Sequence, residues 1–501
     1  GTVTRGYGAL GETVRETRTL GNGVLDTGSS FTTLNRYDSF NRVLETTYPD
    51  GEKLTYGYDT GGQVTTATGV KDGRNYSYLA RQDYDKFDQK LLTDTGSGVR
   101  TTYSYGDADR RLATLKSRQP DGKEFQNLSY QYDNVGNITQ LANTVAVPPA
   151  KGIGGPSTQT FGYDDLNQVT TASGEYRNNP DKANKYKLDL AYDTIHNTTN
   201  KTQRNDLVST SGQTTPIYNT TYTNKYTYDP GRPHAPSKIG QDTNKYDANG
   251  NLIDIGTKDH NVQTVAFTGV TTNDDHTQMV WDEENRLACV VDEDYTVRQE
   301  PDSCADHDVT ARFVYDDSGT RIVKDGKAKE ISPSRGFTKV GSQSFKHVFA
   351  GDTRLLTKKV DSRSEDEQFY FHSDHLGSSG LVTDGTGKLV SHQEYFPSGE
   401  TWAQESAKSA PVPYQYSGKE FDEETGLYYY GSRYYNPRTD LWQSPDPALG
   451  SYLDGSSSDS VRNSANLASY GYGYNNPVGT TDPDGRTALV LAGAAPEVLP
   501  A

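Results

Sequence analysis

Two Asp–Pro units near the C-terminal end carry the side chains of this chain that are best suited to chemistry. They read Asp446-Pro447-Ala448-Leu449-Gly450 and Asp482-Pro483-Asp484-Gly485. Two carboxylates held close together tend to share one proton, because both cannot ionise cheaply. One can then act as a base toward water while the other acts as an acid toward a peptide carbonyl. The alternative interpretation is that both units only form turns, which Asp and Pro favour.

Three further patterns are less specific. A metal site at His372, Asp374 and His375 has no evident further ligand, so we expect hydrogen-bonded structural roles and no metal. Residues 6–11 match Gly-x-Gly-x-x-Gly, but no helix pattern with a suitably spaced acid follows, so they predict a turn, and we expect no cofactor. Cys289 and Cys304 either form a disulfide across one hairpin or remain separate thiols.

The composition limits what kind of protein can position these residues. The chain has 501 residues, a net charge of −17 and 32% hydrophobic residues. It contains no apolar run long enough to predict a membrane-spanning helix, and no basic stripe that predicts nucleic-acid binding. Two cysteines are too few for a disulfide scaffold of this length, and 36 tyrosines argue against disorder. An extended sheet architecture with a thin core fits these numbers.

A repeated pattern supplies that architecture. It consists of an aromatic residue, Asp, two or three variable residues, Gly or Asn, and an aliphatic residue. Copies begin at Tyr37, Tyr58, Tyr84, Tyr105, Tyr132, Tyr163, Tyr192, Tyr246, Trp281 and Tyr315. Most copies are separated by about 20 to 35 residues, which is typical of repeat arrays.

Each repeat predicts a β-hairpin. The segment from Lys53 to Tyr58 alternates as a strand does. The Asp side chain bonds nearby amides, and the Gly or Asn tolerates a positive φ, so a tight turn follows. One hairpin is marginal alone and needs neighbours to bury its face. The class is therefore all-β, and we expect long surface loops at residues 148–156 and 204–216.

The repeats resemble the YD repeats of Rhs proteins, of the B and C components of Tc-type insecticidal toxin complexes, and of teneurins. An ordered set of C-terminal motifs is similar to the Rhs-repeat-associated core domain. These motifs occupy residues 370–378, 416–422, 426–437, 444–447, 470–477 and 482–485. The resemblance implies a hollow shell, often called a cocoon, made of spiralling antiparallel hairpins and closed by a core. It divides the chain into the repeat shell (1–365), the core (366–485) and a short tail (486–501).

In toxin-bearing members of this family, the core is an aspartyl autoprotease that cuts after its second DPxG motif and frees a toxin inside the shell. By this resemblance, Asp446 and Asp482 are the catalytic pair. Arg433 or Arg438 would support the developing negative charge. The cut would fall within the region made up of Gly485, Arg486, Thr487, Ala488 and Leu489.

The first Asp–Pro motif is one residue longer than the family pattern, and the two aspartates lie further apart in the sequence. A Ser/Asp/Gly-rich stretch from Ser451 to Ser464, which contains Asp454 and Asp459, reads as an inserted flexible loop. These departures leave the turn-only interpretation open.

The resemblance also implies partners and a location. We expect a toxin cargo, an upstream shell portion or a B-type shell chain, and delivery by a Tc-type A component or a secretion system. We expect a secreted bacterial protein acting in virulence or bacterial competition. The chain starts at Gly1 inside a repeat and has Met279 as its single methionine, which indicates a piece of a longer polypeptide. The segment after Gly485 is too short for a folded toxin.

Two alternatives remain. The first is a structural or adhesion protein, teneurin-like or cell-wall-associated, in which no protease acts. The second, weaker alternative is carbohydrate binding by an exposed tyrosine-rich face.

Overall fold

The computed structural model describes residues 1–21, 28–149, 152–257, 275–294, 304, 309–360, 367–407, 413–453, 464–486 and 488–490. Their regular structure is almost entirely β, which confirms the predicted all-β class. A 33-stranded sheet dominates the fold, and its strands pair antiparallel, almost always with their neighbours in the chain. This is the pattern that successive hairpin repeats dictate.

The sheet forms a spiral, and its first turn is the outer one. It comprises β1 (Thr2–Tyr7), β2 (Thr13–Thr19), β3 (Ser30–Tyr37), β4 (Val43–Thr47), β5 (Lys53–Tyr58), β6 (Val64–Lys71), β7 (Arg74–Tyr84), β8 (Lys90–Thr95), β9 (Arg100–Tyr105), β10 (Leu112–Arg118), β11 (Glu124–Tyr132), β12 (Ile138–Asn143), β13 (Ser157–Tyr163), β14 (Val169–Asn179), β15 (Lys182–Tyr192), β16 (Thr198–Ser209), β17 (Thr214–Pro216), β18 (Tyr222–Asp229), β19 (Arg232–Ile239), β20 (Asp242–Tyr246), β21 (Leu252–Thr257), β22 (Asp275–Trp281), β23 (Leu287–Asp294), β24 (Val309–Tyr315) and β25 (Arg321–Asp325).

The second turn and the centre follow. The second turn comprises β26 (Lys329–Ser334), β27 (Phe337–Val340), β28 (Gln343–Ala350), β29 (Thr353–Lys359), β30 (Gln368–His372), β31 (Leu381–Asp384), β32 (Leu389–Tyr395) and β33 (Thr401–Ser406). The centre holds a sheet of β34 (Glu420–Asp422), β35 (Leu427–Tyr429), β36 (Tyr434–Asn436) and β37 (Leu441–Trp442), and a pair of β38 (Thr480–Thr481) and β39 (Leu489–Val490). Short helices are α1 (Leu449–Leu453), η1 (Tyr218–Thr220), η2 (Tyr416–Gly418), η3 (Ser464–Leu467) and η4 (Gly473–Asn475).

The Asp of each repeat shapes the turn as predicted. In the first copy, the Asp38 Oδ1 atom accepts the amides of Phe40 and Arg42, both at 2.9 Å. Asn41 occupies the left-handed position, with φ +61°. The geometry of this Asx turn therefore needs only Asp at the first position and Asn or Gly three residues later.

The aromatic residue of each repeat has a role that the pattern did not reveal. In most copies its polar tip donates to a carbonyl at the start of the preceding repeat's returning strand. The Tyr132 hydroxyl bonds the Leu112 carbonyl at 2.8 Å, and Trp281 replaces Tyr with an indole N–H that bonds the Leu252 carbonyl at 2.7 Å. Tyr58, Tyr163, Tyr192 and Tyr315 make the same kind of bond. These bonds tie each hairpin to the one before it.

The loop predicted for residues 204–216 is wrong. Strands β16 and β17 run through this segment and are joined by a tight turn at Gly212, with φ +85°. The inward side chains of β16 are polar, so no apolar alternation marks this strand. Lys201 bonds Asp440 at 2.7 Å and Gln203 bonds Glu400 at 2.8 Å. The other predicted loop does lie between β12 and β13, as far as its residues are described.

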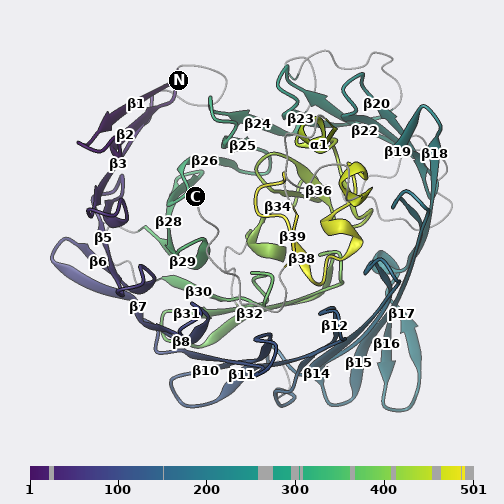
Figure 1. Ribbon diagram of the computed structural model, residues 1–501, viewed down its shortest axis with the longest axis horizontal. Helices are drawn as coiled ribbons and strands as arrows, with labels where there is room; N and C mark the ends of the chain where they lie inside the picture. Colours follow the sequence, from purple (N-terminus) through teal and green to yellow (C-terminus); the bar gives the residue numbers. More distant parts are fainter. Residues whose placement is uncertain are drawn as a thin grey trace.

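Figure 1 shows the spiral: the sheet curves from β1 to β25, and β26–β33 lie inside that arc. The two turns share a core, in which Leu54 and Leu79 of the first turn pack with Val348 and Leu356 of the second. At the closure of the first turn, Arg18 binds Asp316 at 2.6 Å.

The strands of the centre lie inside both turns (Figure 1). Leu427 and Tyr434 of this centre pack against Leu287 and Phe313 of the outer turn. A core rich in tyrosine explains how a chain with few aliphatic residues folds, because a ring supplies apolar area while its hydroxyl finds a partner. The fully buried Tyr435, for example, donates to the Ser398 carbonyl at 2.9 Å.

Three remaining expectations can be placed on this fold. The boundary drawn between residues 365 and 366 falls outside the described residues, so the domain division stays a prediction; β30–β33 beyond it continue the large sheet. Cys289 and Cys304 form a disulfide, which resolves the alternative left open above. In the described part of the chain, no helix has the length and apolarity needed to cross a membrane.

Candidate active site

The two Asp–Pro units follow short central strands. Asp446 comes after β37, and Asp482 directly follows β38. The segment just before β38 returns alongside β37: the Trp442 amide bonds the Tyr470 carbonyl at 2.9 Å, and the Asp446 amide bonds the Ser469 carbonyl at 3.0 Å. Because the chain rejoins β37 in this way, the extra residues between the two units do not separate the aspartates in space.

Arg433 brings the two aspartates together. Its Nη2 atom lies 3.2 Å from Asp446 Oδ2 and 3.1 Å from Asp482 Oδ2. The guanidinium is buried, with its centre 4.1 Å from the centre of the Trp442 ring. Its Nε atom donates to the Gly485 carbonyl at 2.5 Å. One side chain therefore contacts both carboxylates and the backbone of the predicted cleavage region.

Asp482 also anchors a turn. Its Oδ1 atom accepts the amides of Gly485 at 2.8 Å and Arg486 at 3.1 Å, and lies 3.4 Å from the amide of Asp484. Both oxygens of this buried carboxylate thus have partners. Asp482 therefore fits both interpretations: one oxygen holds the turn, and the other contacts the arginine that is shared with Asp446.

Burial raises the pKa of both carboxyl groups above the ordinary range, because the charged form is poorly solvated. Arg433 acts in the opposite direction on both groups. The charge of Asp482 adds to the rise at Asp446, and that of Asp484 adds to the rise at Asp482. The pair is therefore poised to keep a proton at a higher pH than free aspartate does.

The two aspartates differ in access. Asp446 keeps 15% of its side chain exposed, whereas Asp482 keeps 2%. Asp446 also lines a cavity of 790 Å³, together with Asp484 and Arg486. The pair is therefore open to solvent on the side of Asp446.

The predicted cleavage region begins in this turn. Gly485 has φ +76°, and a Cβ atom there would lie 3.0 Å from the Arg433 backbone nitrogen, so the site favours glycine on both counts. Arg486 is exposed and donates to the Ser432 hydroxyl at 2.7 Å. Ala488 is half-buried, and Leu489 pairs with Thr481 through β39 and β38. Thr487 lies outside the described residues.

The second supporting arginine lies elsewhere. Arg438 donates to the Asn219 carbonyl at 2.8 Å, lies 3.4 Å from Glu400, and stacks on the Tyr222 ring. These contacts hold a central segment against the outer turn near η1. Of the two candidate cations, the structure places Arg433 with the aspartates and Arg438 with Glu400.

Lys419 is a residue of this site that sequence reasoning missed. Its Nζ atom donates to the carbonyl of Pro483, one residue after Asp482. It also lines the same cavity as Asp446. No spacing rule connects residues so far apart in the chain, so only the fold reveals the contact.

The His372, Asp374 and His375 group has hydrogen-bonded roles. His372 bonds the Thr383 hydroxyl at 2.9 Å, and His375 donates to the Val478 carbonyl at 2.8 Å. Asp374 caps the amides of Leu376 and Ser378, as the repeat aspartates do.

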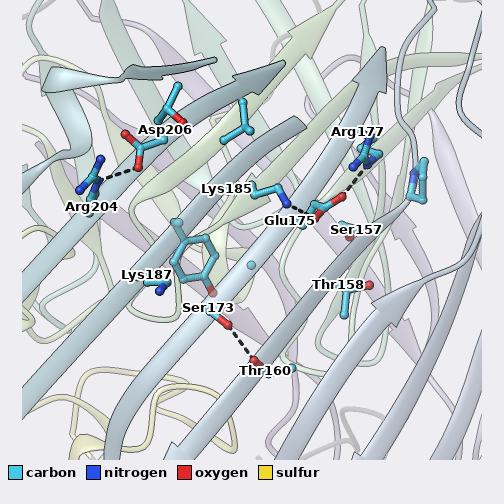
Figure 2. A pocket seen from close by; sticks show the side chains of 15 residues that line it. Ser157, Thr158, Thr160, Ser173, Glu175, Arg177, Lys185, Lys187, Arg204 and Asp206 are labelled. Atoms are coloured by element: carbon cyan, nitrogen blue, oxygen red, sulfur yellow. Dashed lines mark hydrogen bonds and ion pairs between the residues drawn. The ribbon is translucent and has the colours of Figure 1, made fainter. Parts of the chain in front are cut away.

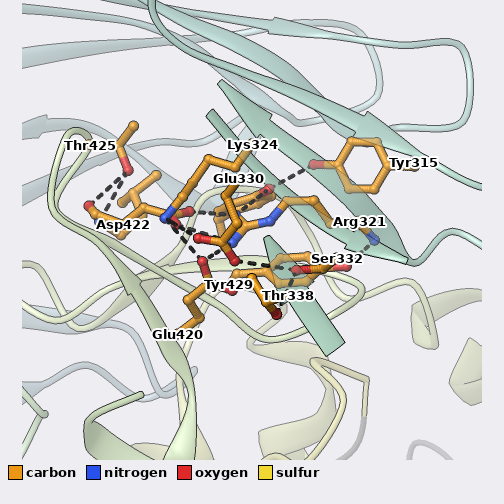
Figure 3. Close-up of polar contacts among 12 residues, drawn as sticks. Tyr315, Arg321, Lys324, Glu330, Ser332, Thr338, Glu420, Asp422, Thr425 and Tyr429 are labelled. Carbon is orange, nitrogen blue, oxygen red and sulfur yellow. Dashed lines mark hydrogen bonds and ion pairs between the residues drawn. The ribbon is translucent and has the colours of Figure 1, made fainter. Parts of the chain in front are cut away.

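A buried ion cluster fixes the central sheet to the second turn of the spiral and to β25. Figure 3 shows Arg321 and Lys324 from β25 pointing at Glu420 and Asp422 of β34. Arg321 lies 2.5 Å from Asp422 and 2.7 Å from Glu420, and Lys324 lies 2.9 Å from Asp422. Burial, reinforced by the charge of Glu420, raises the pKa of Glu330 in the same cluster to about 7.

A second large cavity lies away from the aspartates. Figure 2 shows it over strands β13–β16, with a volume of 810 Å³. Several of its charges pair within the wall, among them Lys185 with Glu175 at 2.7 Å and Arg204 with Asp206 at 2.7 Å. Its lining residues include one aromatic side chain, Tyr186, which is buried. This face therefore lacks the exposed ring that stacking against a sugar needs.

Comparison with known proteins identifies similar chains. A family model described as Teneurin YD-shell matches residues 352–478, and one described as RHS Repeat matches residues 37–74. Toxin subunit YenC1 of Yersinia entomophaga is 29% identical over 505 residues, which cover 91% of this chain and 47% of YenC1. The tRNA nuclease WapA of Bacillus subtilis is 27% identical over 52% of this chain and 10% of WapA.

Solved structures show the same fold. The crystal structure of TcdB2-TccC3-Cdc42 matches 96% of this chain and 23% of that chain, with a TM-score of 0.66 and 23% identity. A Tc holotoxin pore from Photorhabdus luminescens matches 95% of this chain and 23% of that chain, with a TM-score of 0.64 and 22% identity. This chain spans about half the length of the YenC subunits that it resembles.

Proposed function

Because this chain belongs to the Rhs/YD-repeat family, we propose that its β-shell encloses a toxin and that its core cuts its own chain to release that cargo. The carrying observation is the contact of one arginine nitrogen with both Asp446 and Asp482. The shared cation keeps the two carboxyl groups close, while the burial that raises both pKa values favours one retained proton on the pair.

The chemistry follows from the access of each group. Asp446 faces the cavity and takes a proton from water, while Asp482 gives its proton to the carbonyl oxygen of the scissile peptide. The water oxygen bonds the carbonyl carbon to give a diol. As the C–N bond breaks, the departing amine takes the proton held by Asp446, and a hydroxyl of the diol returns a proton to Asp482. Arg433 stabilises the negative charge that develops on the way. The cut falls between Gly485 and Leu489.

The partners proposed are those of a toxin complex. They are a toxin cargo, an upstream shell portion or B-type chain, and a Tc-type A component or secretion system that delivers the assembly out of a bacterium. The similarity to a toxin subunit over 91% of this chain supports this assignment.

A second candidate is a non-catalytic structural or adhesion shell. The match to the Teneurin YD-shell model favours it, as does the use of both Asp482 oxygens in holding a turn and an arginine. In that case the Asp–Pro units serve only the architecture.

A fusion experiment separates the two candidates. A small folded reporter is placed after Ala501, and the parent is compared with Asp446→Asn and Asp482→Asn. The matched control is Asp165→Asn, at an exposed side chain outside this cavity. Autoproteolysis predicts that the reporter separates on a denaturing gel in the parent and the control only. Encapsulation predicts that it stays with the shell in native size-exclusion chromatography. An intact fusion in all four proteins would favour the structural candidate.

A further inference from the structure

Lys419 holds the backbone of the second Asp–Pro unit. Its ammonium donates to the Pro483 carbonyl, and it lies 5.3 Å from the centre of the Tyr430 ring. The same turn is held from the other side by Arg433, which bonds the Gly485 carbonyl. Lys419 and Arg433 therefore each donate a hydrogen bond to a backbone carbonyl, one just before Asp484 and one just after it.

Lys419 is also fixed to the shell through its neighbour. Glu420, the next residue, binds Arg321 at 2.7 Å and Lys324 at 3.0 Å (Figure 3). The Lys419 amide bonds the Tyr416 carbonyl at 3.0 Å, which fixes the backbone on the other side. The shell therefore determines where this ammonium group lies.

We propose that Lys419 is a positioning residue for self-cleavage, which holds the Pro483 carbonyl so that the chain after Asp482 lies against the carboxylate pair. This inference rests on the proposed autoproteolysis. It adds a role for the shell, because strand β25 fixes β34 and thereby the lysine that presents the cleavage region.

The charge of Lys419 is sensitive to pH. Burial lowers its pKa to about 8, against the attraction of Asp482 and Asp484. Arg335 lowers this pKa further and Asp352 raises it. Since the pKa is lowered, the ammonium is present below pH 8 and is lost as the pH rises through that value. A hydrogen bond from a charged donor is about twice as strong as one from a neutral donor. The bond from Lys419 to the Pro483 carbonyl therefore weakens when the lysine loses its proton.

The test compares cleavage rates of the parent, Lys419→Met and Lys419→Arg by intact mass over time. The control is Lys327→Met, at a side chain that is 70% exposed. We expect Lys419→Met to cut roughly 10- to 100-fold more slowly than the parent, the range for losing a charge-assisted hydrogen bond. We expect Lys419→Arg to retain most of the rate. We expect the melting temperatures of the variants not to follow the order of their cleavage rates.

A pH series distinguishes positioning from simple structural damage. Arginine keeps its charge, so the rate of Lys419→Arg relative to the parent rises about 10-fold between pH 7 and pH 9, as expected for loss of a proton near pH 8. The deficit of Lys419→Met relative to the parent shrinks over the same interval. Because the parent and the variants contain the same two aspartates, the titration of those aspartates affects every rate equally and drops out of these ratios. Constant ratios, or a Lys419→Met chain that cuts at the parent rate, would overturn the inference.

Hydrogen exchange tests the position without cleavage. In an Asp446→Asn background, adding Lys419→Met should speed the hydrogen exchange of the Gly485 and Arg486 amides. Both amides donate hydrogen bonds to Asp482 Oδ1. Unchanged exchange would overturn the inference even if the parent is never cut. A parent that stays whole at every pH would instead count against the proposed autoproteolysis.

Discussion

Asp446 and Asp482 lie on opposite sides of the predicted loop from Ser451 to Ser464, yet both bind the same Nη2 atom of Arg433, at 3.2 Å and 3.1 Å. The segment at Ser469 and Tyr470, which follows that loop in the sequence, returns along β37 and so brings the two aspartates together. The structure thus brings the two Asp–Pro aspartates to one cation despite their separation in the sequence.

Arg433→Met should abolish cleavage and destabilise the fold. Removing the cation leaves two largely buried carboxylates without their compensating charge, which costs about 3 to 5 kcal/mol. Urea unfolding and the intact mass report the two effects. The matched control, Arg438→Met, loses a pairing with Glu400 that lies outside the aspartate site. Cleavage in that control should proceed at the parent rate, and equal loss in both variants would contradict the assignment.

The stability of the parent should carry a pH signature from Asp482. Burial raises the pKa of this group in the folded state, so the folded chain binds its proton more tightly than the unfolded chain does. Its contribution is present below the unfolded pKa of about 4 and is lost as the pH rises through the folded value. Subtracting urea unfolding curves of Asp482→Asn from those of the parent should show this fall. A difference that does not change with pH would show that the group titrates normally.

The ion cluster between β25 and β34 should be a large contributor to stability. Lys324→Met leaves Asp422, which is fully buried, with one cation fewer and should lower the free energy of unfolding by about 3 kcal/mol. Lys327→Met removes an exposed pair with Glu423 and should change it by less than about 1 kcal/mol. Denaturant titration measures both. Similar values for the two variants would mean that the cluster does not fasten the centre to the shell.

The hydroxyl that links successive repeats can be removed alone. Tyr132→Phe deletes the bond to the Leu112 carbonyl and should cost about 0.5 to 1.5 kcal/mol. Tyr218→Phe, at a residue that is 62% exposed, is the control and should be neutral. Thermal melting measures both variants. Equal melting temperatures for the two would mean that the bond between repeats does not contribute to stability.

The sequence predicted the hairpin repeats well because each turn is local. An Asp that caps amides two and four residues later, followed by Asn or Gly, needs no distant partner. Strand β16 was missed because its inward face is polar, with Lys201 and Gln203 satisfied by residues of the centre and of the second turn. Such a face shows no apolar alternation, so its strand is visible only once the partners are in place.

The candidate site was predictable in its acids but not in its cations. Motif order pointed to Asp446 and Asp482, whereas Arg433 and Arg438 were equal candidates by their positions in the sequence. Burial against Trp442 places Arg433 with the pair, and packing against Tyr222 takes Arg438 away. Lys419 had no local signal, since its contact with Pro483 depends on the packing of the whole core.

The most direct test of the central claim is the intact mass of the denatured chain, measured beside Asp482→Asn. The account predicts that the parent loses the segment that follows the cut between Gly485 and Leu489, while the variant keeps its full mass. A parent and a variant that both keep the full mass would contradict self-cleavage by this pair of aspartates.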